Sequence, residues 1–475
     1  MKLAAVVLAA GLGTRMKSAL PKVLHPLGGK PMVQQVIETV QSLKPAASVV
    51  VVGPGNGEIR NALKDFPVRF AVQKEPKGTG DAFKAAVQVL KKFEGTLLVV
   101  SGDTPLITGE TLRELLRLHR RRKEDISLLS FEAEGPHAYG RIIRKGSTVA
   151  AIVEDRDAGT EQKKIKEVNS GIYALEAPMV KLLKEIRLNE KKGEYYLTDL
   201  IHIAVGKGFR VGAHPLGNER ELTGINTRSD LYRAGMYLRD RVLARLLDRG
   251  ITFMDKNSVF IHPDAEIGED TVIYPNVHIE GKTVVGNGCV LYPNCRIVDS
   301  VLGNGVVVKD STLVESSVIK DRAEVGPFAH LRPGSVIGPS AKIGNFVEVK
   351  KSVIGEGTKA SHLSYLGDAE IGNNVNIGAG TITCNYDGRM KHRTVIEDEV
   401  FIGSDTQLVA PVRVGKGAYI GAGSTITKEV PSHSLALSRT AQRHIENWAV
   451  RRQEKAAAQK PARNGNRKGS GKAPR

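Results

Sequence analysis

Cysteine is scarce in this sequence. The 475 residues include three cysteines, Cys289, Cys295 and Cys384. A low and odd number argues against a disulfide framework, so we expect reduced thiols in a cytoplasmic protein. Cys289 and Cys295 lie six residues apart, and we interpret them as small apolar residues in adjacent strands rather than as metal ligands.

Long apolar runs are also lacking, because no stretch approaches the roughly 20 residues that a membrane helix needs. The apolar run near the start, Leu3–Ala10, has eight residues and is followed closely by Arg15, Lys17 and Lys22. It is too short, and too soon followed by charge, for a secretory signal peptide. It predicts a buried parallel strand, and we expect no membrane partner.

Acidic residues are fewer than basic ones, 51 against 69, which gives a net charge of +18. Such a charge usually suggests a polyanionic partner such as nucleic acid. The tail Arg451–Arg475, however, holds nine of the basic residues and only one acidic residue. It is rich in Ala, Gly, Lys and Pro, so we expect it to be disordered. The remaining charge suits anionic small-molecule substrates, and a nucleic-acid partner is not expected.

Aliphatic residues recur every six positions between about Ile261 and Ile426. The recurring residues are Ile267, Ile273, Ile279, Val285, Leu291 and Ile297, then, after a slip of four, Val301, Val307, Leu313, Ile319, Val325, Leu331, Ile337, Ile343 and Val349, and later Ile371, Ile377, Ile402, Leu408, Val414, Ile420 and Ile426. This period fits a short strand plus a turn, with one aliphatic side chain pointing inward. Stacked coils of three such units predict a parallel β-helix rather than a glycine-rich sandwich.

The six-residue pattern resembles that of the hexapeptide-repeat acyltransferases. The resemblance implies a left-handed β-helix and a homotrimer, although the general rule for parallel crossovers favours the right hand. The charged, leucine-rich run Arg228–Arg249, stopped by Gly250, predicts one linker helix. We therefore expect an N-terminal domain at 1–227, a linker helix at 228–250, a β-helix domain at 251–439 and a C-terminal segment at 440–475.

The N-terminal half alternates between strand-like and helix-like segments. The predicted strands are Leu3–Ala9, Ser48–Val52, Val68–Val72 and Thr96–Val100, and the predicted helices lie near Met32–Leu43, Glu58–Phe66, Thr79–Phe93 and Thr108–Lys123. This alternation predicts a Rossmann-like, doubly wound α/β domain with a mostly parallel sheet. Ligands of such folds bind beyond the carboxyl ends of the strands.

The loop after the first strand reads LAAGLGTRM and leads into LPKVLH. Gly11 and Gly13 let the backbone approach a phosphate closely, and Arg15 and Lys22 add positive charge. The loop is not a P-loop, since GxxxxGK[ST] is absent, and it is not the dinucleotide fingerprint, since Met16 stands where a third glycine is needed. Ser101-Gly102-Asp103 ends a predicted strand, which places a hard oxygen ligand for Mg²⁺ at the edge of the site.

The loop and its downstream PK resemble the signature of sugar-1-phosphate nucleotidylyltransferases. With the later segments around Gln73, Gly140, Glu154, Asn169 and Asn226, the order resembles the bacterial bifunctional N-acetylglucosamine-1-phosphate uridylyltransferase/glucosamine-1-phosphate acetyltransferase family. The resemblance implies that UTP and the sugar are bound by Leu8, Gly11, Lys22, Gln73, Gly78, Thr79, Gly140, Glu154, Asn169 and Asn226. It implies Asp103 and Asn226 as Mg²⁺ ligands and catalytic roles for Arg15 and Lys22. Leu12 and Asp81 depart from the family pattern, which commonly has a basic residue and a histidine there.

The β-helix segment contains an irregular stretch, Thr381–Thr394, that breaks the six-residue period, and such insertions tend to be functional loops. With about 18 residues per coil, Lys350 is expected opposite Asp368, and Tyr365 opposite Thr383. His362 is then expected to share a face with Lys350 and Asn376.

This part resembles the acetyltransferase site of the same bifunctional family from Phe328 to Val412. The resemblance implies that His362 is the general base, because imidazole can accept a proton near neutral pH. It implies that Arg332, Lys350, Tyr365, Asn376 and Lys391 bind the sugar phosphate. It implies that acetyl-CoA is bound by Ala379, Asn385, Tyr386, Ser404, Ala422 and Arg439, with Asn385 and Tyr386 also orienting substrate and base.

Two other functions remain open from the residues themselves. The first is a sugar-1-phosphate nucleotidylyltransferase whose β-helix only assembles or regulates it. The second is a non-enzymatic scaffold of paired pseudo-domains. His362 and the loop that carries Asn385 argue against the first, and the pair Asp103 and Asn226 argues against the second.

Overall fold

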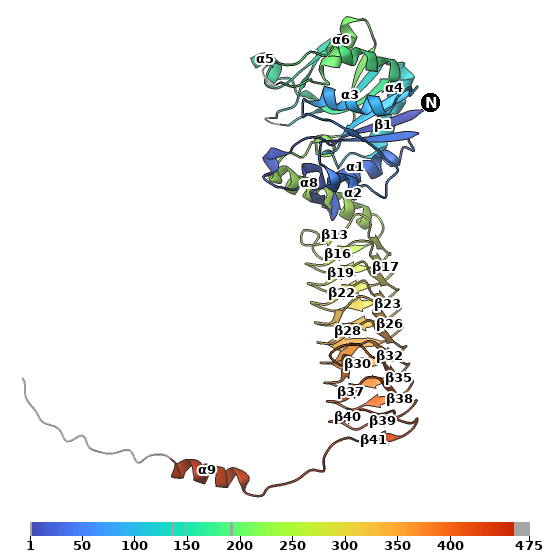
Figure 1. Cartoon of the computed structure of the whole chain (residues 1–475), viewed down its shortest axis with the longest axis vertical. Coiled ribbons are helices and arrows are strands. Elements are labelled where there is room, and N and C mark those ends of the chain that lie inside the picture. The colour runs from blue at the N-terminus through green and yellow to red at the C-terminus, as the bar shows by residue number, and fades with distance from the viewer. Residues whose placement is uncertain (1, 135–136, 147, 191–192, 460–475) are drawn as a thin grey trace, which may run out of the picture.

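The computed structural model describes residues 2–134, 137–146, 148–190 and 193–459. A layered α/β body at the N-terminal end is joined by one helix to a long column of short strands (Figure 1). Both predicted architectures, the α/β sheet and the parallel β-helix, are therefore confirmed.

The N-terminal sheet has nine strands, in the order β11-β7-β10-β6-β1-β4-β5, with β8 paired to β10 and β9 paired to β8. The strands are β1 (Leu3–Leu8), β4 (Ala47–Val52), β5 (Arg69–Val72), β6 (Thr96–Ser101), β7 (Ile126–Glu132), β8 (Arg141–Lys145), β9 (Thr148–Val153), β10 (Glu167–Glu176) and β11 (Val211–Pro215). The four predicted strands correspond to β1, β4, β5 and β6. The sheet is mixed, however, because β10 runs antiparallel to both β6 and β7.

Helices cover both faces of this sheet. They are α1 (Met32–Gln41), α2 (Gly57–Ala62), α3 (Thr79–Val89), α4 (Gly109–Arg122), α5 (Thr160–Lys163), α6 (Asp199–Gly206) and α7 (Glu219–Leu222), with 3-10 turns η1 (Thr14–Met16), η2 (Lys22–Leu24) and η3 (Ala177–Lys184). Alternate residues of β1 serve the two layers: Ala4 and Val6 pack with α3 and α6, whereas Ala5 and Val7 pack with α1, α2 and α4. This alternation follows from the two-residue period of a strand.

The joint between body and column consists of α8 (Arg228–Leu247) and a small hairpin, β2 (Pro26–Leu27) and β3 (Lys30–Pro31). Thr227 and Asp230 form a reciprocal capping box that fixes the start of α8. In the hairpin, Lys30 forms an ion pair of 2.5 Å with Asp264 at the top of the column. The apolar core of the column continues without a break from its lower coils through α8 to Leu27.

The column has three parallel sheets, which we call its first, second and third faces. The first face contains β12 (Thr252–Phe253), β15 (Val272–Ile273), β18 (Val290–Leu291), β21 (Val307–Val308), β24 (Glu324–Val325), β27 (Lys342–Asn345), β30 (Lys359–His362), β33 (Asn376–Ile377), β36 (Phe401–Ile402), β39 (Tyr419–Ile420) and β41 (Leu435–Ala436). The second contains β13 (Phe260–Ile261), β16 (His278–Glu280), β19 (Arg296–Val298), β22 (Leu313–Glu315), β25 (His330–Leu331), β28 (Glu348–Lys350), β31 (Tyr365–Gly367), β34 (Ile382–Cys384), β37 (Gln407–Val409) and β40 (Thr425–Ile426). The third contains β14 (Glu266–Ile267), β17 (Val284–Val285), β20 (Val301–Leu302), β23 (Val318–Ile319), β26 (Val336–Ile337), β29 (Val353–Ile354), β32 (Ala369–Ile371), β35 (Thr394–Ile396) and β38 (Val412–Val414).

The predicted inward residues are wrong by one position in the coil that begins at β20. Val301 is 46% exposed, whereas its neighbour Leu302 is 2% exposed. The same exchange places Val308 and Val314, rather than Val307 and Leu313, in the core. The cause is a shorter coil, because Val285 pairs with Leu302, 17 residues further on.

The C-terminal segment contains a helix, α9 (Trp448–Ala458), which stands clear of the column (Figure 1). The prediction of disorder is therefore wrong for residues 451–458, where alanine, arginine, glutamine and glutamate favour a helix. No residue of α9 is buried. The rest of the predicted disordered tail, 460–475, lies outside the described residues.

Candidate active sites

The glycine-rich loop follows β1, and Gly13 near its start packs closely against Lys22 near its end. Gly13 has a φ of +63°, and a β-carbon there would lie 2.5 Å from Cβ of Lys22. Any side chain would therefore push Lys22 away, so the glycine is required by both conformation and space. Leu8 closes β1 beneath the loop, and Gly11 has open space around it. Leu12, one of the departures, is 73% exposed.

Lys22, Asp103, Asn226 and Arg15 converge beyond the carboxyl ends of β1 and β6. Nζ of Lys22 forms an ion pair with Oδ2 of Asp103 and donates to Oδ1 of Asn226 at 3.1 Å. Nη2 of Arg15 donates to the same Asn226 oxygen at 2.9 Å. Four residues from three segments that are remote in sequence are thus brought together.

The pair Asp103 and Asn226 suits a hard cation. Their side-chain oxygens already meet at one positive charge, the ammonium group of Lys22. The other oxygen of Asp103 accepts a hydrogen bond of 2.6 Å from Ser101, which orients the carboxylate. One carboxylate and one amide oxygen match the ligand type that Mg²⁺ prefers.

Gln73, Gly78 and Thr79 lie together at the start of α3. The side-chain amide of Gln73 donates to the Gly78 carbonyl and to the Asp81 carboxylate, both at 3.0 Å. Asp81, the second departure, therefore orients Gln73. Gly78 has a φ of +94°, and a β-carbon there would lie 2.6 Å from the carbonyl oxygen of Tyr195.

Gly140, Glu154 and Asn169 form a third group, contributed by β8–β10 and the turns beside them. The backbone N–H of Asn169 donates to the Gly140 carbonyl at 2.8 Å. Thr198 donates to the carboxylate of Glu154 at 2.9 Å. The Asn169 amide donates to the hydroxyl of Tyr173 at 2.7 Å, and burial raises the pKa of that phenol.

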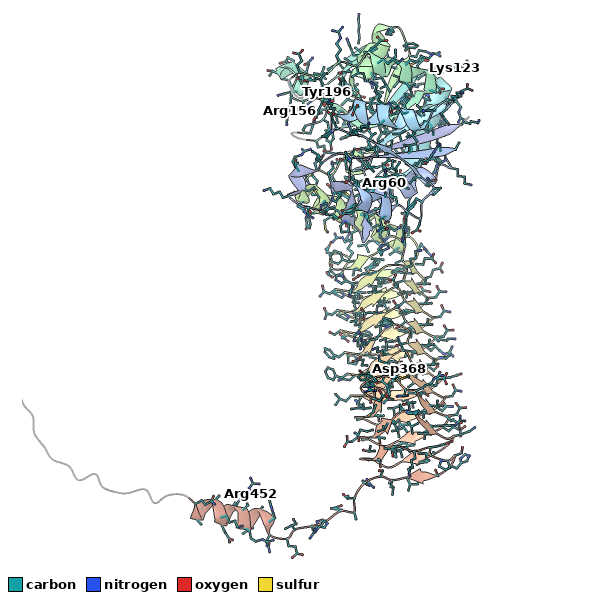
Figure 2. The ribbon with its side chains drawn as sticks, in the orientation of Figure 1. Arg60, Lys123, Arg156, Tyr196, Asp368 and Arg452 are labelled. Carbon is teal, nitrogen blue, oxygen red and sulfur yellow. The ribbon has the colours of Figure 1, made fainter. Side chains whose placement is uncertain are left out.

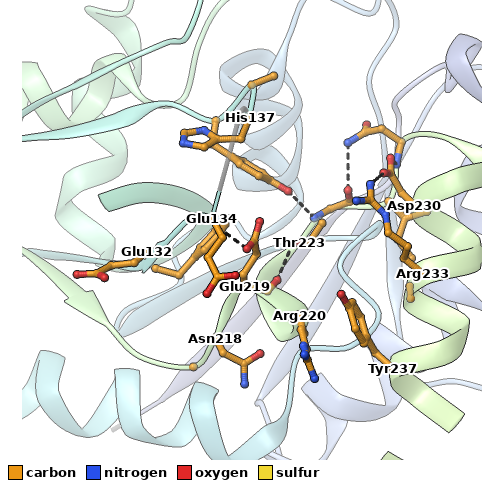
Figure 3. A pocket seen from close by; sticks show the side chains of 18 of the residues that line it. Glu132, Glu134, His137, Asn218, Glu219, Arg220, Thr223, Asp230, Arg233 and Tyr237 are labelled. Carbon is orange, nitrogen blue, oxygen red and sulfur yellow. Dashed lines mark hydrogen bonds and ion pairs between the residues drawn. The ribbon is translucent and has the colours of Figure 1, made fainter. Parts of the chain in front are cut away.

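A cavity of about 1160 Å³ lies beside these groups, between β7, α7 and α8 (Figure 3). Of the predicted nucleotide-site residues, Arg15 and Asn226 line it. Gln73, Gly78, Gly140, Glu154 and Asn169 do not line it, so the cavity contains only part of the predicted site.

In the column, His362 ends β30 at the corner between the first and second faces. Asn376 shares the first face with it, as predicted, but Lys350 lies on the second face. The expected pairings are also wrong by one residue, because Lys350 faces Gly367 rather than Asp368, and Tyr365 faces Ile382 rather than Thr383. These coils have 17 residues rather than 18.

The second face presents a cluster of cations. Contact with Lys391, together with the charges of Arg332 and Lys391, lowers the pKa of Lys350. The Arg332 guanidinium also forms an ion pair of 2.8 Å with Glu348. Three cationic side chains held this close together are suited to an anion such as a phosphate.

Tyr365, Asn385 and Asp368 form a polar group next to this cluster. The Asn385 amide donates to Asp368 at 2.5 Å and to the Tyr365 hydroxyl at 3.4 Å. Gly367 lies beneath them, and a β-carbon there would lie 2.8 Å from Nδ2 of Asn385. Asp368 lies in the lower part of the column, several coils below the joint (Figure 2).

His362 lies on a line of equivalent corner positions that continues in the coils below it. Gly380 N–H donates to the carbonyl of Leu363, the residue after His362, at 2.9 Å. Equivalent backbone hydrogen bonds connect the coils below. The N–H of Asp405 donates to the Ala379 carbonyl, and the N–H of Gly423 donates to the Ser404 carbonyl. Arg439 donates to the Ala422 carbonyl at 2.7 Å. The structure thus aligns His362 with Ala379, Ser404, Ala422 and Arg439 along one corner.

Family models match three parts of the chain. The MobA-like NTP transferase domain matches residues 5–168, the GMPPB C-terminal domain matches 256–332, and the bacterial transferase hexapeptide (six repeats) matches 393–428. The bifunctional protein GlmU of Thermodesulfovibrio yellowstonii is 53% identical over 450 residues, covering 94% of this chain and 99% of the relative. The bifunctional protein GlmU of Syntrophotalea carbinolica is 49% identical over 455 residues, covering 96% and 98%.

The chain belongs to the GlmU family. A solved structure of a putative glucose-1-phosphate thymidylyltransferase from Bacillus anthracis is 20% identical and covers 50% of this chain and 96% of its own, with a TM-score of 0.42. Among the residues that the structure describes, no helix has the length and apolar character to span a membrane.

Several residues that organise this GlmU chain were not predicted from the sequence. Arg228 contacts the glycine-rich loop after β1, Gly367 supports Tyr365 and Asn385, and Asp387 ties together the irregular loop. The Asp387-Gly388 pair is a turn signal that could have indicated the last of these. Arg228 gave no signal, because its contacts lie more than 200 residues away in sequence.

Proposed function

We propose that the chain carries out two reactions of UDP-N-acetylglucosamine synthesis in two separate sites. The column transfers the acetyl group of acetyl-CoA to glucosamine-1-phosphate. The N-terminal body then transfers the uridylyl group of UTP to N-acetylglucosamine-1-phosphate and releases pyrophosphate. One observation carries the proposal: a single GlmU chain contains both sets of residues. The glycine-rich loop lies beside the side-chain oxygens of Asp103 and Asn226, and His362 lies on a corner of the column beside the cations Arg332, Lys350 and Lys391.

In acetyl transfer, Arg332, Lys350 and Lys391 bind the phosphate of the sugar. A bound dianion offsets the repulsion that lowers the Lys350 pKa, which favours this ligand. His362 takes a proton from the sugar ammonium, and the amine attacks the thioester carbonyl. The carbon–sulfur bond breaks, and the thiol of coenzyme A leaves with a proton.

The remaining predicted residues position the two acetyl-transfer substrates. Coenzyme A extends along the corner line formed by Ala379, Ser404, Ala422 and Arg439, below His362. Asn376, Tyr365, Asn385 and Tyr386 orient the sugar and the base. Asn385 and Tyr365 are already hydrogen-bonded to each other, which favours a rigid site.

In uridylyl transfer, a phosphate oxygen of the sugar attacks the α-phosphorus of UTP, and the bond to pyrophosphate breaks. Such a displacement needs positioning and charge neutralisation rather than a protein nucleophile. Arg15 and Lys22 neutralise the phosphates, and Gly11 brings the backbone close to them. Asp103 and Asn226 would hold Mg²⁺, which supplies further charge neutralisation when bound.

Gln73 provides a physical reason for uracil. Both of its amide N–H groups donate within the protein, to Gly78 and Asp81, which leaves its oxygen as the group that can accept from the N3–H of the base. Gly78 and Thr79 flank the base, Leu8 lies beneath it, and Gly140, Glu154 and Asn169 hold the sugar and ribose.

The active form is proposed to be a cytoplasmic homotrimer. At the corner that carries His362, the rings of Phe328 and Phe346 stack at 5.3 Å and are 50% and 56% exposed. Leu363, directly after His362, is 63% exposed. These bulky residues all have positive φ, an uncommon conformation for them. An apolar ridge beside a catalytic histidine favours a neighbouring subunit that covers the site.

Mass spectrometry of one reaction tests the proposal. The mixture contains the protein, glucosamine-1-phosphate, acetyl-CoA, UTP and Mg²⁺, and UDP-N-acetylglucosamine is the expected product. N-acetylglucosamine-1-phosphate alone would show that the N-terminal site does not use UTP. No acetylated sugar would favour the alternative, a nucleotidylyltransferase with a structural β-helix.

The variant His362→Ala separates the two sites. Removal of the base is expected to lower the acetyl-transfer rate roughly 100- to 10,000-fold. Uridylyl transfer from added N-acetylglucosamine-1-phosphate should remain unchanged. Loss of both activities, or of neither, would contradict the assignment of separate sites.

A further inference from the structure

The start of α8 is joined directly to the proposed uridylyl-transfer site. Asn226 comes two residues before the first residue of the helix, Arg228. The Asp230 carboxylate accepts from the backbone N–H of Asn226 at 3.1 Å and from that of Thr227 at 2.9 Å. The position of Asn226 is therefore fixed by the first turn of α8.

Arg228 extends from that same turn to the glycine-rich loop at residues 9–25, which we call the nucleotide loop. Its Nε donates to the Met16 carbonyl at 3.3 Å, and its Nη1 donates to Nδ1 of His25 at 3.1 Å. Met16 directly follows Arg15, and His25 directly follows the turn that begins with Lys22. One guanidinium thus contacts the chain next to both catalytic cations.

Apart from the side-chain contacts of Arg15 and Lys22 with Asn226 and Asp103, most of the loop is exposed. Leu12, Thr14, Arg15 and the stretch 17–20 are exposed, and Lys17 has a φ of +49°. Met16 is buried, and His25 is 3% exposed and faces the carbonyl of Leu20. Arg228 connects these two fixed points to the helix that fixes Asn226.

We propose that Arg228 is a positioning residue for uridylyl transfer, which holds Arg15 and Lys22 in register with Asn226 by tying the nucleotide loop to the start of α8. The inference rests on the proposed function of the N-terminal site. The planar guanidinium matters because it donates in two directions from one rigid group. A shift of about 1 Å between reacting groups can cost roughly 100-fold in rate.

The test compares Arg228→Ala and Arg228→Lys with Arg249→Ala, a matched arginine removal at an exposed position after α8. In the full-length protein, kcat for uridylyl transfer should fall roughly 10- to 100-fold in Arg228→Ala. KM for both substrates should change little, because the groups that bind them remain. Lys keeps one donor and should recover part of the rate, and added guanidinium ion should do the same for Arg228→Ala.

His25→Phe provides a second, independent variant, because phenylalanine keeps the ring and lacks the acceptor. The double variant with Arg228→Ala should be no slower than the slower single variant, since both remove the same contact. Acetyl transfer at the other site should be unchanged in every variant, which shows that the chain is folded.

Three results would overturn the inference. These are a normal uridylyl-transfer kcat in Arg228→Ala, fully additive losses in the double variant, and an equal loss of both activities, which would indicate a structural role. Failure of the proposed function gives a different result, because the unaltered protein would then lack uridylyl transfer altogether.

Discussion

Gly367 sets the closest packing in the proposed acetyl-transfer site. Its α-carbon lies under the Tyr365 hydroxyl and the Asn385 amide, with no room for a methyl group. Gly367→Ala should displace these side chains and lower the acetyl-transfer rate roughly 10- to 100-fold. Both activities are measured on the same sample, and uridylyl transfer should be unaffected. Unchanged acetyl transfer would show that Tyr365 and Asn385 do not orient the substrate.

The sequence predicted which residues share a site better than it predicted which of them face each other. Lys22, Asp103 and Asn226 were expected in one site, and they do meet at hydrogen-bonding distance. The pairing of Lys350 with Asp368 was wrong by one residue, because a coil length of 17 cannot be distinguished from 18 by composition. Asp81 was recognised as a departure, but its contact with Gln73 depends on the tight turn at Gly78.

Among the elements, the irregular loop after β34 is held together by one carboxylate. Asp387 accepts from the backbone N–H groups of Met390 and Arg389 and from His392. These bonds, with that from Met390 the largest cause, lower its pKa. The loop carries Tyr386 and Lys391, which pair with each other across it.

Asp387→Ala should therefore loosen this loop and raise KM for glucosamine-1-phosphate several-fold, with uridylyl transfer as the internal control. A carboxyl group whose pKa is depressed in the folded protein stabilises it above the ordinary value of about 3.9, and this contribution is lost as pH falls through the lower folded value. The acetyl-transfer rate plotted against pH should thus show no titration step from Asp387 between about pH 5 and 8. A step in that range that disappears in the variant would contradict this assignment.

The presence of the strands was predictable from the sequence. Which residue of each strand points into the core was not predictable in every coil. At β20, β21 and β22 the sequence offers two adjacent aliphatic residues, such as Val301 and Leu302, and either can point inward. Burial selects the second, because the coil before it is one residue shorter. The antiparallel β10 was likewise unpredictable, since its pairing with β6 and β7 joins segments far apart in the chain.

For the whole molecule, the exposed ridge at the corner of His362 predicts assembly. Phe346→Asp places a charge on this ridge and should convert the proposed trimer to monomers in light scattering or ultracentrifugation, because burial of an unpaired charge is costly. Acetyl transfer should fall with it, and uridylyl transfer should persist. Val353→Asp, on the third face away from that corner, is the matched control and should remain trimeric. A trimeric and fully active Phe346→Asp variant would contradict the interface.

The length of the column has a metabolic consequence. Six steps between stacked strands separate β13, beside the joint, from β31, beside His362, which amounts to about 29 Å along the axis. The proposed acetyl-transfer site therefore lies far from the proposed uridylyl-transfer site. We expect the acetylated intermediate to pass through the surrounding pool, where its concentration would follow the relative rates of the two sites. Having both sites in one chain guarantees equal numbers of the two sites, but it does not provide direct transfer of the intermediate from the first site to the second.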